Sequence, residues 1–267
     1  MENSFLQFFD ALSAPQRSLL VVNRTQPDPL VRILEGTFEG QPVSVSEVDV
    51  PDVDDDTVLL VEQTGNETDL RIIATSPLSE LEETILLVNS DLYKTGTAGF
   101  SEEGFPAVLA KLEEVPFVLR GYPESNNEKL LLIAMSRFIE RRAYRHESGR
   151  LRTSFQRLSR IEDERGTWNV YRTFDESGVQ THVYGVPDWR PPSDSTLIAH
   201  GGYTAEFRNS WFVVYRPIDA DGSESTESDE SHAALVAVQT EPRTWRGFWT
   251  FRPELVCDIE SYVARNL

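Results

Sequence analysis

Apolar residues in this chain occur in short uninterrupted runs, the longest of four to six residues, such as LLLIAM at 130–135 and WFVVY at 211–215. A helix that crosses a membrane needs about 20 consecutive apolar residues, so these runs predict no membrane span. Runs of this length that are bounded by polar residues are typical of buried β-strands. They alternate with segments whose apolar residues recur at helical spacing, which indicates mixed sheets flanked by helices.

The pattern predicts an α/β protein at the border of α+β. We expect a mixed sheet with one parallel β-α-β unit at about 151–185, an antiparallel extension, and two lobes of similar size. The predicted strands are 18–23, 43–48, 57–62, 70–74, 117–120, 151–155, 181–185, 211–215, 233–238 and 245–251. The predicted helices are 5–12, 28–38, 77–88, 105–114, 127–145, 163–176 and 253–267. The segment AHGGYTAEF at 199–207 is expected to be a loop.

The charge composition indicates the habitat of the protein more than its partners. The chain has a formal net charge of −19, with 44 acidic and 25 basic residues, and its lysines are Lys94, Lys111 and Lys129. A carboxylate-rich surface with little Lys stays hydrated at high salt, where long-range repulsion is screened. The composition therefore predicts a halophilic cytoplasm, and the alternative is an acidic face that engages a basic partner. The acidic N-terminal segment does not resemble a signal peptide, in agreement with a cytoplasmic location.

A change in composition predicts a domain boundary in GYPESNN at 121–127. Residues 1–123 carry 7 basic and 22 acidic residues, net −15, whereas residues 124–267 carry 18 and 22, net −4. We therefore expect an N-terminal α/β domain at 1–120 and a second domain at 124–267. The two halves show a similar order of elements, and EVDVPD at 47–52 is similar to HVYGVPD at 182–188. This similarity has two explanations, a divergent internal duplication and a coincidence of two ordinary α+β domains.

Sequence motifs for catalysis are not found. The single cysteine, Cys257, excludes an internal disulfide and a Cys-based zinc cluster. The four histidines have no spacing that would place two of them on one helix face as metal ligands. His182 is predicted to be a satisfied core or edge histidine. We expect no cofactor, no metal, no catalytic residues and no nucleic-acid partner, since the second half is still net negative and has no base-reading motif.

Eight arginines lie between residues 137 and 160. Most are expected to pair with the protein's own carboxylates across the sheet. Arg142 is different because, at 100° per residue, it falls on the apolar face of its helix, where a guanidinium needs a buried carboxylate or an anionic ligand. Arg157 and Arg160 follow a predicted strand, at the end where α/β sheets often bind ligands.

Aromatic residues on the predicted strands supply the other candidates for a ligand site. One face of strand 245–251 would present Trp249 next to Gly247, which leaves room for a flat ligand or for a closely packed backbone. Core packing is the structural alternative for these residues. The complete set of candidate ligand-binding residues is Arg142, Arg157, Arg160, Tyr184, Trp211 and Trp249.

A set of short motifs in the second half resembles the DICT sensory domain family, the domain associated with diguanylate cyclases and two-component systems. The motifs are SRFIERRAYR (136–145), SFQRLSR (154–160), VYGVPD (183–188), NSWFVVY (209–215), AALVAV (233–238) and RGFWTFRPELV (246–256). The resemblance covers about residues 124–267 and is closest to the stand-alone haloarchaeal type. It implies a sensory or regulatory input module with no established ligand, so it assigns no site residues. The acidic loop 219–231 looks longer than is usual in the family.

Three hypotheses of function follow. The first is a non-enzymatic sensor in cytoplasmic signal transduction, which binds a small ligand or relays a signal to a signalling partner, with residues 1–120 as a possible effector. The second is a ligand-free interaction scaffold in which helix 127–145 forms a homodimer or partner surface. The third is an enzyme of unknown reaction.

Overall fold

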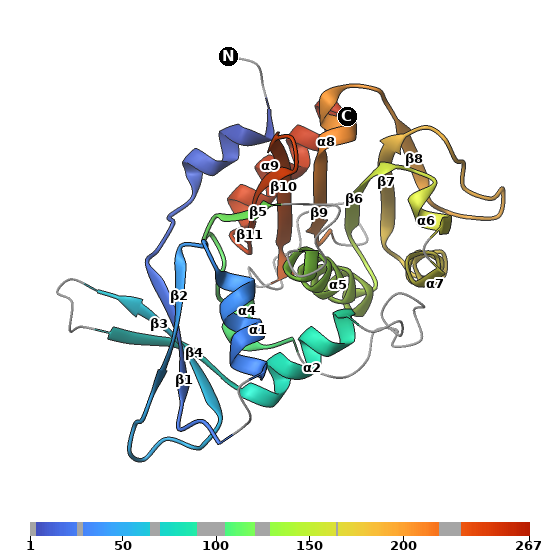
Figure 1. Ribbon diagram of the computed structural model, residues 1–267. Coiled ribbons are helices and arrows are strands. Elements are labelled where there is room, and N and C mark those ends of the chain that lie inside the picture. The colour runs from blue at the N-terminus through green and yellow to red at the C-terminus, as the bar shows by residue number, and fades with distance from the viewer. Residues whose placement is uncertain are drawn as a thin grey trace.

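The computed structural model describes residues 4–25, 29–64, 70–89, 105–120, 129–163, 165–218 and 231–267. It contains a four-stranded and a seven-stranded β-sheet with helices packed on them (Figure 1), which confirms the predicted mixed α/β class. No helix in these ranges is long and apolar enough to span a bilayer. The predicted boundary turn at 121–127, the hairpin turn at 65–66 and nearly all of the acidic loop lie outside the described residues.

The four-stranded sheet has the order β2-β1-β3-β4, and we call it, together with helix α1, the small lobe. Its strands are β1 (Arg17–Val22), β2 (Val43–Val48), β3 (Thr57–Gln63) and β4 (Leu70–Pro77). β1 is parallel to β2 and antiparallel to β3, which is antiparallel to β4. α1 (Pro29–Phe38) follows β1 and buries Val31 and Phe38 in the same apolar cluster as Leu19 and Leu60 of the sheet.

The other face of the small sheet carries a minor apolar cluster of Val22, Leu59 and Val61. At the edge strand β4 this face is open: Ile72 pairs with Val61 and is 59% exposed, and Leu70 is 54% exposed. Large apolar side chains at this exposure are unusual on an edge strand, which folded proteins normally protect with charges or a covering element.

The seven-stranded sheet has the order β5-β11-β10-β9-β6-β7-β8, and we call it, with its helices, the large lobe. Its strands are β5 (Phe117–Arg120), β6 (Arg150–Arg157), β7 (Gln180–Val186), β8 (Ile198–Gly201), β9 (Ser210–Arg216), β10 (Ala233–Glu241) and β11 (Thr244–Thr250). β6 and β7 are parallel and are joined through α6 (Arg160–Asp163) and α7 (Arg165–Phe174), which confirms the predicted β-α-β unit. β9, β10 and β11 form the predicted antiparallel extension.

The segment predicted to be a loop at 199–207 instead contains most of the edge strand β8 and the start of helix α8 (Ala205–Asn209). Both elements are too short for periodicity to reveal them, because a strand of four residues or a single helical turn shows no repeating pattern.

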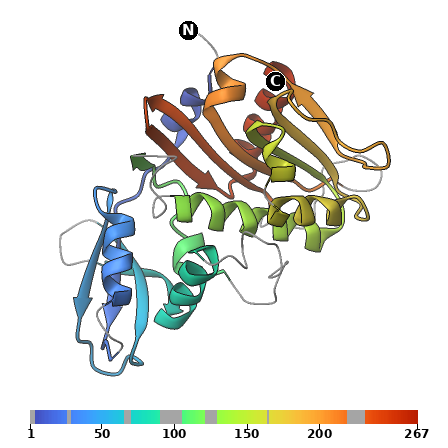
Figure 2. The same cartoon turned by 45° about the vertical axis from the view of Figure 1, so that its right-hand side comes forward.

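Helices cover both faces of the large sheet (Figures 1 and 2). α5 (Lys129–His146) lies on one face, where Val213 and Tyr215 of the central strand β9 belong to the main core. On the opposite face, Phe212 and Val214 pack with α9 (Pro253–Asn266) and with the N-terminal 3₁₀ helix η1 (Phe5–Ala11). Alternate residues of the strand therefore enter different cores, as expected for a strand covered on both sides.

The two lobes do not divide at the predicted boundary, and they are not of similar size as predicted, since one sheet has four strands and the other seven. η1 and β5 come from the first half of the chain, yet η1 packs on α9, and β5 pairs with β11 of the large sheet. One cluster of buried apolar residues also runs from Leu19 in the small sheet through Leu109 to Met135 in α5. Because the segments on either side of 121–127 share a core, the change in charge at this point does not mark the limit of the large lobe.

The strand order of the small sheet recurs inside the large one. The order β2-β1-β3-β4 corresponds to β7-β6-β9-β10, with the same parallel and antiparallel pairings. The two similar sequence segments also match in place, since Val50–Pro51–Asp52 follows β2 and Val186–Pro187–Asp188 closes β7. This common topology is what a divergent duplication would leave.

Candidate functional site

The six candidate ligand-binding residues do not form one site. Arg142, Trp211 and Trp249 belong to the face of the large sheet that α5 covers, and Tyr184 is in the core on the opposite face. Arg157 ends β6 and Arg160 begins α6, at the end of the sheet. Arg142, Tyr184, Trp211 and Trp249 lie in the elements that the sequence predicted, whereas Arg157, predicted to follow the strand, is its last residue. The sequence did not predict on which side of the sheet each side chain lies.

Arg142 lies between two aromatic rings. Its guanidinium carbon is 5.0 Å from the centre of the Phe138 ring and 4.8 Å from that of Phe251, and Nη1 donates to the His232 carbonyl at 3.4 Å. Cation–π contacts and a carbonyl acceptor accommodate this charge without a ligand. On the same face, the indole N–H of Trp211 donates to Ser136 Oγ at 3.1 Å.

Arg157 and Arg160 hold the end of β6 in place. Arg157 donates to Asp188 Oδ2 at 2.7 Å with its side chain 63% exposed, and Asp188 also accepts the Ser159 N–H at 2.9 Å. Arg160 donates to Gln156 Oε1, and Gln156 has a φ of 57° at the irregularity in the β6–β7 pairing. These contacts fix the end of β6 and the segment Val186–Pro187–Asp188 at the end of β7. The two arginines therefore have structural partners within the protein.

Trp249 is part of the core, and the space beside Gly247 is filled by the protein. The Trp249 ring is 3% exposed and lies 5.6 Å from the Phe117 ring, centre to centre. A Cβ atom on Gly247 would come within 2.3 Å of Phe117 Cζ and 3.0 Å of Ala237 Cβ. The small residue between two tryptophans therefore admits Phe117 of β5, not a flat ligand.

Gly247→Ala is expected to lower the free energy of unfolding by about 1–3 kcal/mol, because the added methyl group overpacks this contact. Phe117→Ala in the same chain should recover part of this loss, which a double-mutant cycle by denaturant unfolding measures. Gly36→Ala is the matched control: nothing lies within 4 Å of its Cβ position in α1, so a gain of about 0.5–1 kcal/mol is expected. Additive effects of the Gly247 and Phe117 changes would contradict the proposed contact.

Tyr184 leads to a buried polar cluster between β6, β7, β8 and α9. Its hydroxyl accepts a hydrogen bond from Arg152, and its ring stacks on His200 at 4.4 Å with an interplanar angle of 7°. Arg152 lies opposite His182 in the β6–β7 register, and His200 lies opposite Tyr184 in the β7–β8 register. The strand pairing therefore places a guanidinium, a phenol and two imidazoles side by side.

Glu260 of α9 is the carboxylate of this cluster. Its Oε1 accepts from Arg152 Nε at 2.7 Å and from Arg150 Nη1 at 3.1 Å, and its Oε2 lies 3.6 Å from Arg216 Nη1. Burial acts to raise the pKa of Glu260, but the hydrogen bonds and charges of Arg152 and Arg150 outweigh it and leave the pKa below its usual value. Three guanidinium groups thus converge on one ionised carboxylate whose side chain is 4% exposed.

His182 and His200 form a hydrogen-bonded pair. His182 Nδ1 and His200 Nε2 are 2.8 Å apart, so one imidazole donates and the other accepts. Burial, the Arg152 charge and His200 together lower the pKa of His182 to about 4, and burial followed by Arg152 also lowers the pKa of His200. His182 Nε2 is buried without a hydrogen-bond partner among the described residues, so the predicted satisfied histidine is satisfied on one side of its ring only.

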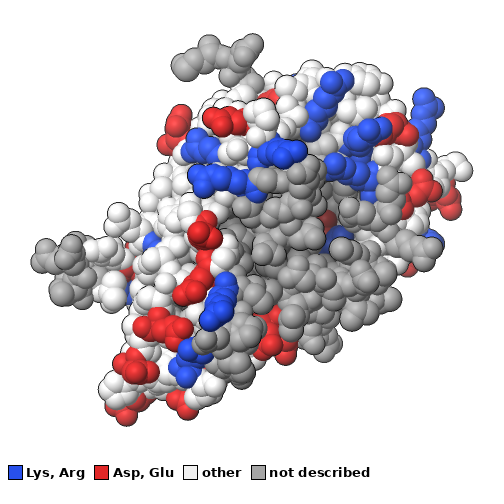
Figure 3. All heavy atoms as spheres, viewed as in Figure 1, with Lys and Arg blue, Asp and Glu red and all other residues white. Residues whose placement is uncertain are grey.

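Sequence analysis missed Arg152, Glu260 and the histidine pair as a group. The signal for Glu260 was present, because it stands four residues after Val256 and three before Val263, on the inward face of the last helix. A carboxylate at such a position requires a buried cation. Residues 137–160, which contain eight arginines, include two of the partners of Glu260, Arg150 and Arg152. On the face shown in Figure 3, Lys and Arg side chains gather over the large lobe.

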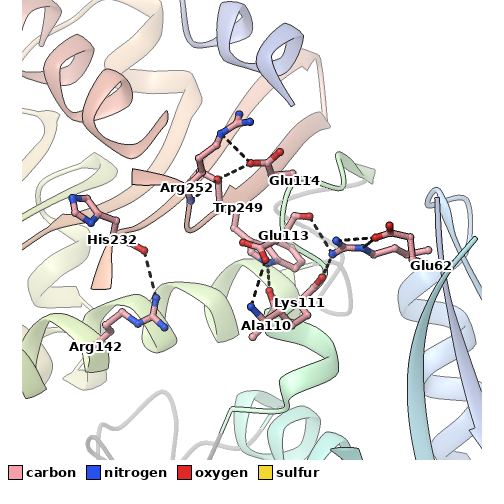
Figure 4. A network of polar contacts seen from close by, with 11 residues as sticks. Glu62, Ala110, Lys111, Glu113, Glu114, Arg142, His232, Trp249 and Arg252 are labelled. Atoms are coloured by element: carbon pink, nitrogen blue, oxygen red, sulfur yellow. Dashed lines mark hydrogen bonds and ion pairs between the residues drawn. The ribbon is translucent and has the colours of Figure 1, made fainter. Parts of the chain in front are cut away.

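A second polar network joins the two lobes through the segment 105–120, which we call the interlobe segment (Figure 4). On the large-lobe side, the Trp249 indole N–H donates to the Ala110 carbonyl at 3.1 Å, and the Glu114 N–H donates to the Trp249 carbonyl at 2.7 Å. Glu114 also accepts from Thr250 Oγ1 at 3.2 Å, and its Oε1 lies 3.3 Å from Arg252 Nε. The interlobe segment is therefore fastened to the end of β11.

On the small-lobe side, Arg17 of β1 holds the same segment. Its guanidinium donates to the carbonyls of Lys111 and Glu113 and lies 3.4 Å from Glu62 Oε2 of β3. The side chain of Gln41 makes a two-way contact with the β5 backbone, donating to the Val118 carbonyl at 2.6 Å and accepting its N–H at 2.7 Å. Hydrogen bonds from Arg17 and Gln41 therefore tie the interlobe segment to the small lobe as well.

Comparisons with known proteins leave the family of this chain open. No protein-family model matches the chain, and no curated protein matches it. Among solved structures, a crystal structure of polyphosphate kinase from Porphyromonas gingivalis is similar with a TM-score of 0.30 and 11% sequence identity, over 96% of this chain and 46% of that chain. At this TM-score and identity the likeness carries no argument about activity.

Proposed function

We propose that this protein is a non-enzymatic sensory or regulatory module of cytoplasmic signal transduction in a halophilic archaeon, similar to DICT domains. The large lobe would receive the signal, and the small lobe would pass it to a signalling partner. The observation that carries the proposal is the interlobe segment, which Trp249 holds from one sheet and Arg17 from the other. Such a connection lets a change in one lobe bias the other.

The buried carboxylates of Glu140 and Glu260 are paired within the protein, which favours a regulatory role over a catalytic one. Glu140 accepts from Arg137 at 2.6 Å and from the Tyr171 hydroxyl at 2.7 Å, and Glu260 is shared by the arginines around it. Carboxylates held in this way are already engaged by the protein's own groups. A catalytic acid or base instead needs access to a substrate proton.

A test of the relay uses a panel of nucleotides and metabolites in multimolar KCl. We expect a compound that raises the melting temperature to change amide hydrogen exchange in residues 105–120 and in β1, in addition to its own binding region. Arg17→Gln, which removes the bonds to the Lys111 and Glu113 carbonyls, should abolish the change in β1 while leaving binding intact.

Arg71→Gln is the matched control for the relay. Arg71 also pairs with Glu62, at 3.6 Å, but its side chain is 66% exposed and its partner is on the small sheet. This variant should transmit the ligand effect as the wild type does. Exchange that changes equally in β1 of wild type and Arg17→Gln would refute the relay, and multiple turnover of a panel compound would refute the non-enzymatic role.

The alternative function is a ligand-free interaction or dimerisation scaffold. Helix α5, the predicted partner surface, does not suit this role, because its residues 131–143 are buried or half-buried against the sheet and α2 (Leu78–Asn89). Exposed Leu70 and Ile72 on β4 favour the small lobe instead. A stable dimer by light scattering, together with no response to the panel, would favour this alternative.

A further inference from the structure

Two guanidinium groups share one oxygen of Glu260, and a third lies near the other oxygen. Arg150 and Arg152 both direct a donor at the same oxygen, Oε1, while Arg216 approaches Oε2 at 3.6 Å. One carboxylate offers two oxygens, and a single guanidinium can satisfy both through its planar fork. Arg150 and Arg152 thus share a counter-charge that one of them could take alone.

The fold itself does not require these charges. When the two similar Val-Pro-Asp segments are aligned, Ser46 and Val48 of the small lobe correspond to His182 and Tyr184. Leu20 pairs with Ser46 in the small sheet, as Arg152 pairs with His182 in the large one. The same strand pairing is thus built with apolar and small residues, so Arg152 and His182 serve a purpose other than strand pairing.

The free nitrogen of His182 points to a ligand group in the same place. In one tautomer, His200 Nε2–H donates to His182 Nδ1, and the proton of His182 is then on Nε2, where it has no acceptor among the described residues. An N–H in this state is a donor for an oxyanion, and leaving it buried without an acceptor costs free energy. His182 is 8% exposed, so the imidazole is held firmly in its position.

Arg150, at the start of β6, is the more exposed of the two arginines. Its side chain is 30% exposed, compared with 7% for Arg152, and its Nε donates to Gln180 Oε1 at 2.9 Å at the start of β7. Of Arg150, Arg152 and His182, Arg150 is therefore the one most exposed to solvent.

We propose that Arg150, Arg152 and His182 bind an oxyanion, the phosphate or carboxylate group of a small molecule, which competes with Glu260 for the guanidinium groups. Weakening the contacts of Glu260 would free α9, whose Tyr262 packs against Phe5 of η1 with ring centres 5.0 Å apart. Arg252, which precedes α9, has its Nε 3.3 Å from Glu114 Oε1 of the interlobe segment, so this gives the ligand a route to the small lobe through that segment, and that consequence rests on the proposed sensory function.

Inorganic phosphate and acetate are the two probes, each added at constant ionic strength in KCl to the full-length chain. Binding is followed by the melting temperature and by the ¹⁵N resonances of the imidazoles. We expect at least one probe to raise the melting temperature in a saturable way and to shift the ¹⁵N resonances of the His182 imidazole. A response to phosphate alone assigns a phosphate ligand, and a response to acetate alone assigns a carboxylate.

Arg150→Gln should weaken the binding of the probe roughly tenfold or more, because one charge-assisted hydrogen bond is lost. Arg265→Gln, an exposed arginine on α9 that contacts the Ser261 carbonyl, is the matched control and should bind as the wild type does. If Arg150→Gln does not fold, Arg150→Lys keeps the charge without the planar fork and should bind more weakly than the wild type.

If a probe raises the melting temperatures of wild type, Arg150→Gln and Arg265→Gln equally, the proposed site is refuted. Phosphate also stabilises proteins without binding, because it is excluded from their surfaces. The absence of a saturable response to both probes would overturn the site as well. Binding that leaves hydrogen exchange in residues 105–120 unchanged would refute the relay and leave the oxyanion site standing, so the two proposals fail separately.

Discussion

Replacement of Glu260 by Gln is expected to lower the free energy of unfolding by about 3–5 kcal/mol, the loss typical of breaking a buried ion pair by removing one partner. The amide keeps the size of the side chain but leaves the buried guanidinium group of Arg152 and the half-buried one of Arg150 without their counter-charge. Denaturant unfolding in multimolar KCl measures the effect, because high salt screens a buried pair much less than an exposed one.

Asp258→Asn is the matched control for this loss. Asp258 lies two residues earlier on α9 and is exposed, so the same change from carboxylate to amide should alter stability by no more than about 0.5 kcal/mol. A loss in Glu260→Gln as small as that in Asp258→Asn would show that the arginines find other partners, and that Glu260 does not anchor α9 to the sheet.

Lowering the pH from 6.5 to about 4 is expected to destabilise the protein, with a contribution from His182 on the order of 3 kcal/mol. The pKa of this imidazole falls from 6.5 to about 4 in the folded state, so the unfolded chain binds a proton in this interval while the folded protein does not. The stabilisation is fully present above pH 6.5 and is lost as the pH falls toward the folded-state pKa. The lowered pKa of His200 adds to the loss in the same direction.

Burial is the main reason why His182 remains neutral, and most of the groups that face it lower its pKa further. Arg150 and Arg152 approach from β6, His200 from β8 and Glu260 from α9, and the arginines oppose a further positive charge. Glu260 has a pKa below 4.5, so its own contribution to stability is lost only at lower pH. The interval from pH 6.5 to 4.5 therefore reports mainly on the histidines among the groups of this cluster.

Urea unfolding at several pH values tests this prediction. His182→Gln, which cannot take up a proton, should show a flatter dependence of stability on pH than the wild type between 6.5 and 4.5, and His200→Gln should be intermediate. Wild type and His182→Gln curves that run parallel over this interval would mean that the imidazole is protonated as easily in the folded protein as in the unfolded one.

Much of the fold was predictable because its signals are local. Runs such as WFVVY at 211–215 and AALVAV at 233–238 are covered on both faces, and continuous apolarity is typical of central strands. The helix predicted at 163–176 is present as α7, where Trp168 and Tyr171 follow helical spacing. By contrast, β8 and α8 have four and five residues and show no period.

The candidate site was less predictable because it depends on contacts between distant residues. Gly247 between two tryptophans indicated either a ligand or close packing, and Phe117, 130 positions earlier in the chain, decides for packing. The sequence suggested that Arg142 requires an anion. In the structure its guanidinium instead makes cation–π contacts with two phenylalanine rings and donates a hydrogen bond to a carbonyl. A sequence pattern shows what a side chain needs but not which neighbour supplies it.

The sequence by itself determined the class of fold, the order of most strands and helices, and the β-α-β unit, because apolar periodicity and turn chemistry act over a few residues. The tertiary structure decided which side chains meet. It placed η1 and β5 with the large lobe, and it brought Arg150, Arg152, Tyr184, His182, His200 and Glu260 from four elements into one buried cluster. The physical reason is that strand register and helix docking are fixed by the shared core, whose contacts join residues as far apart as Arg152 and Glu260.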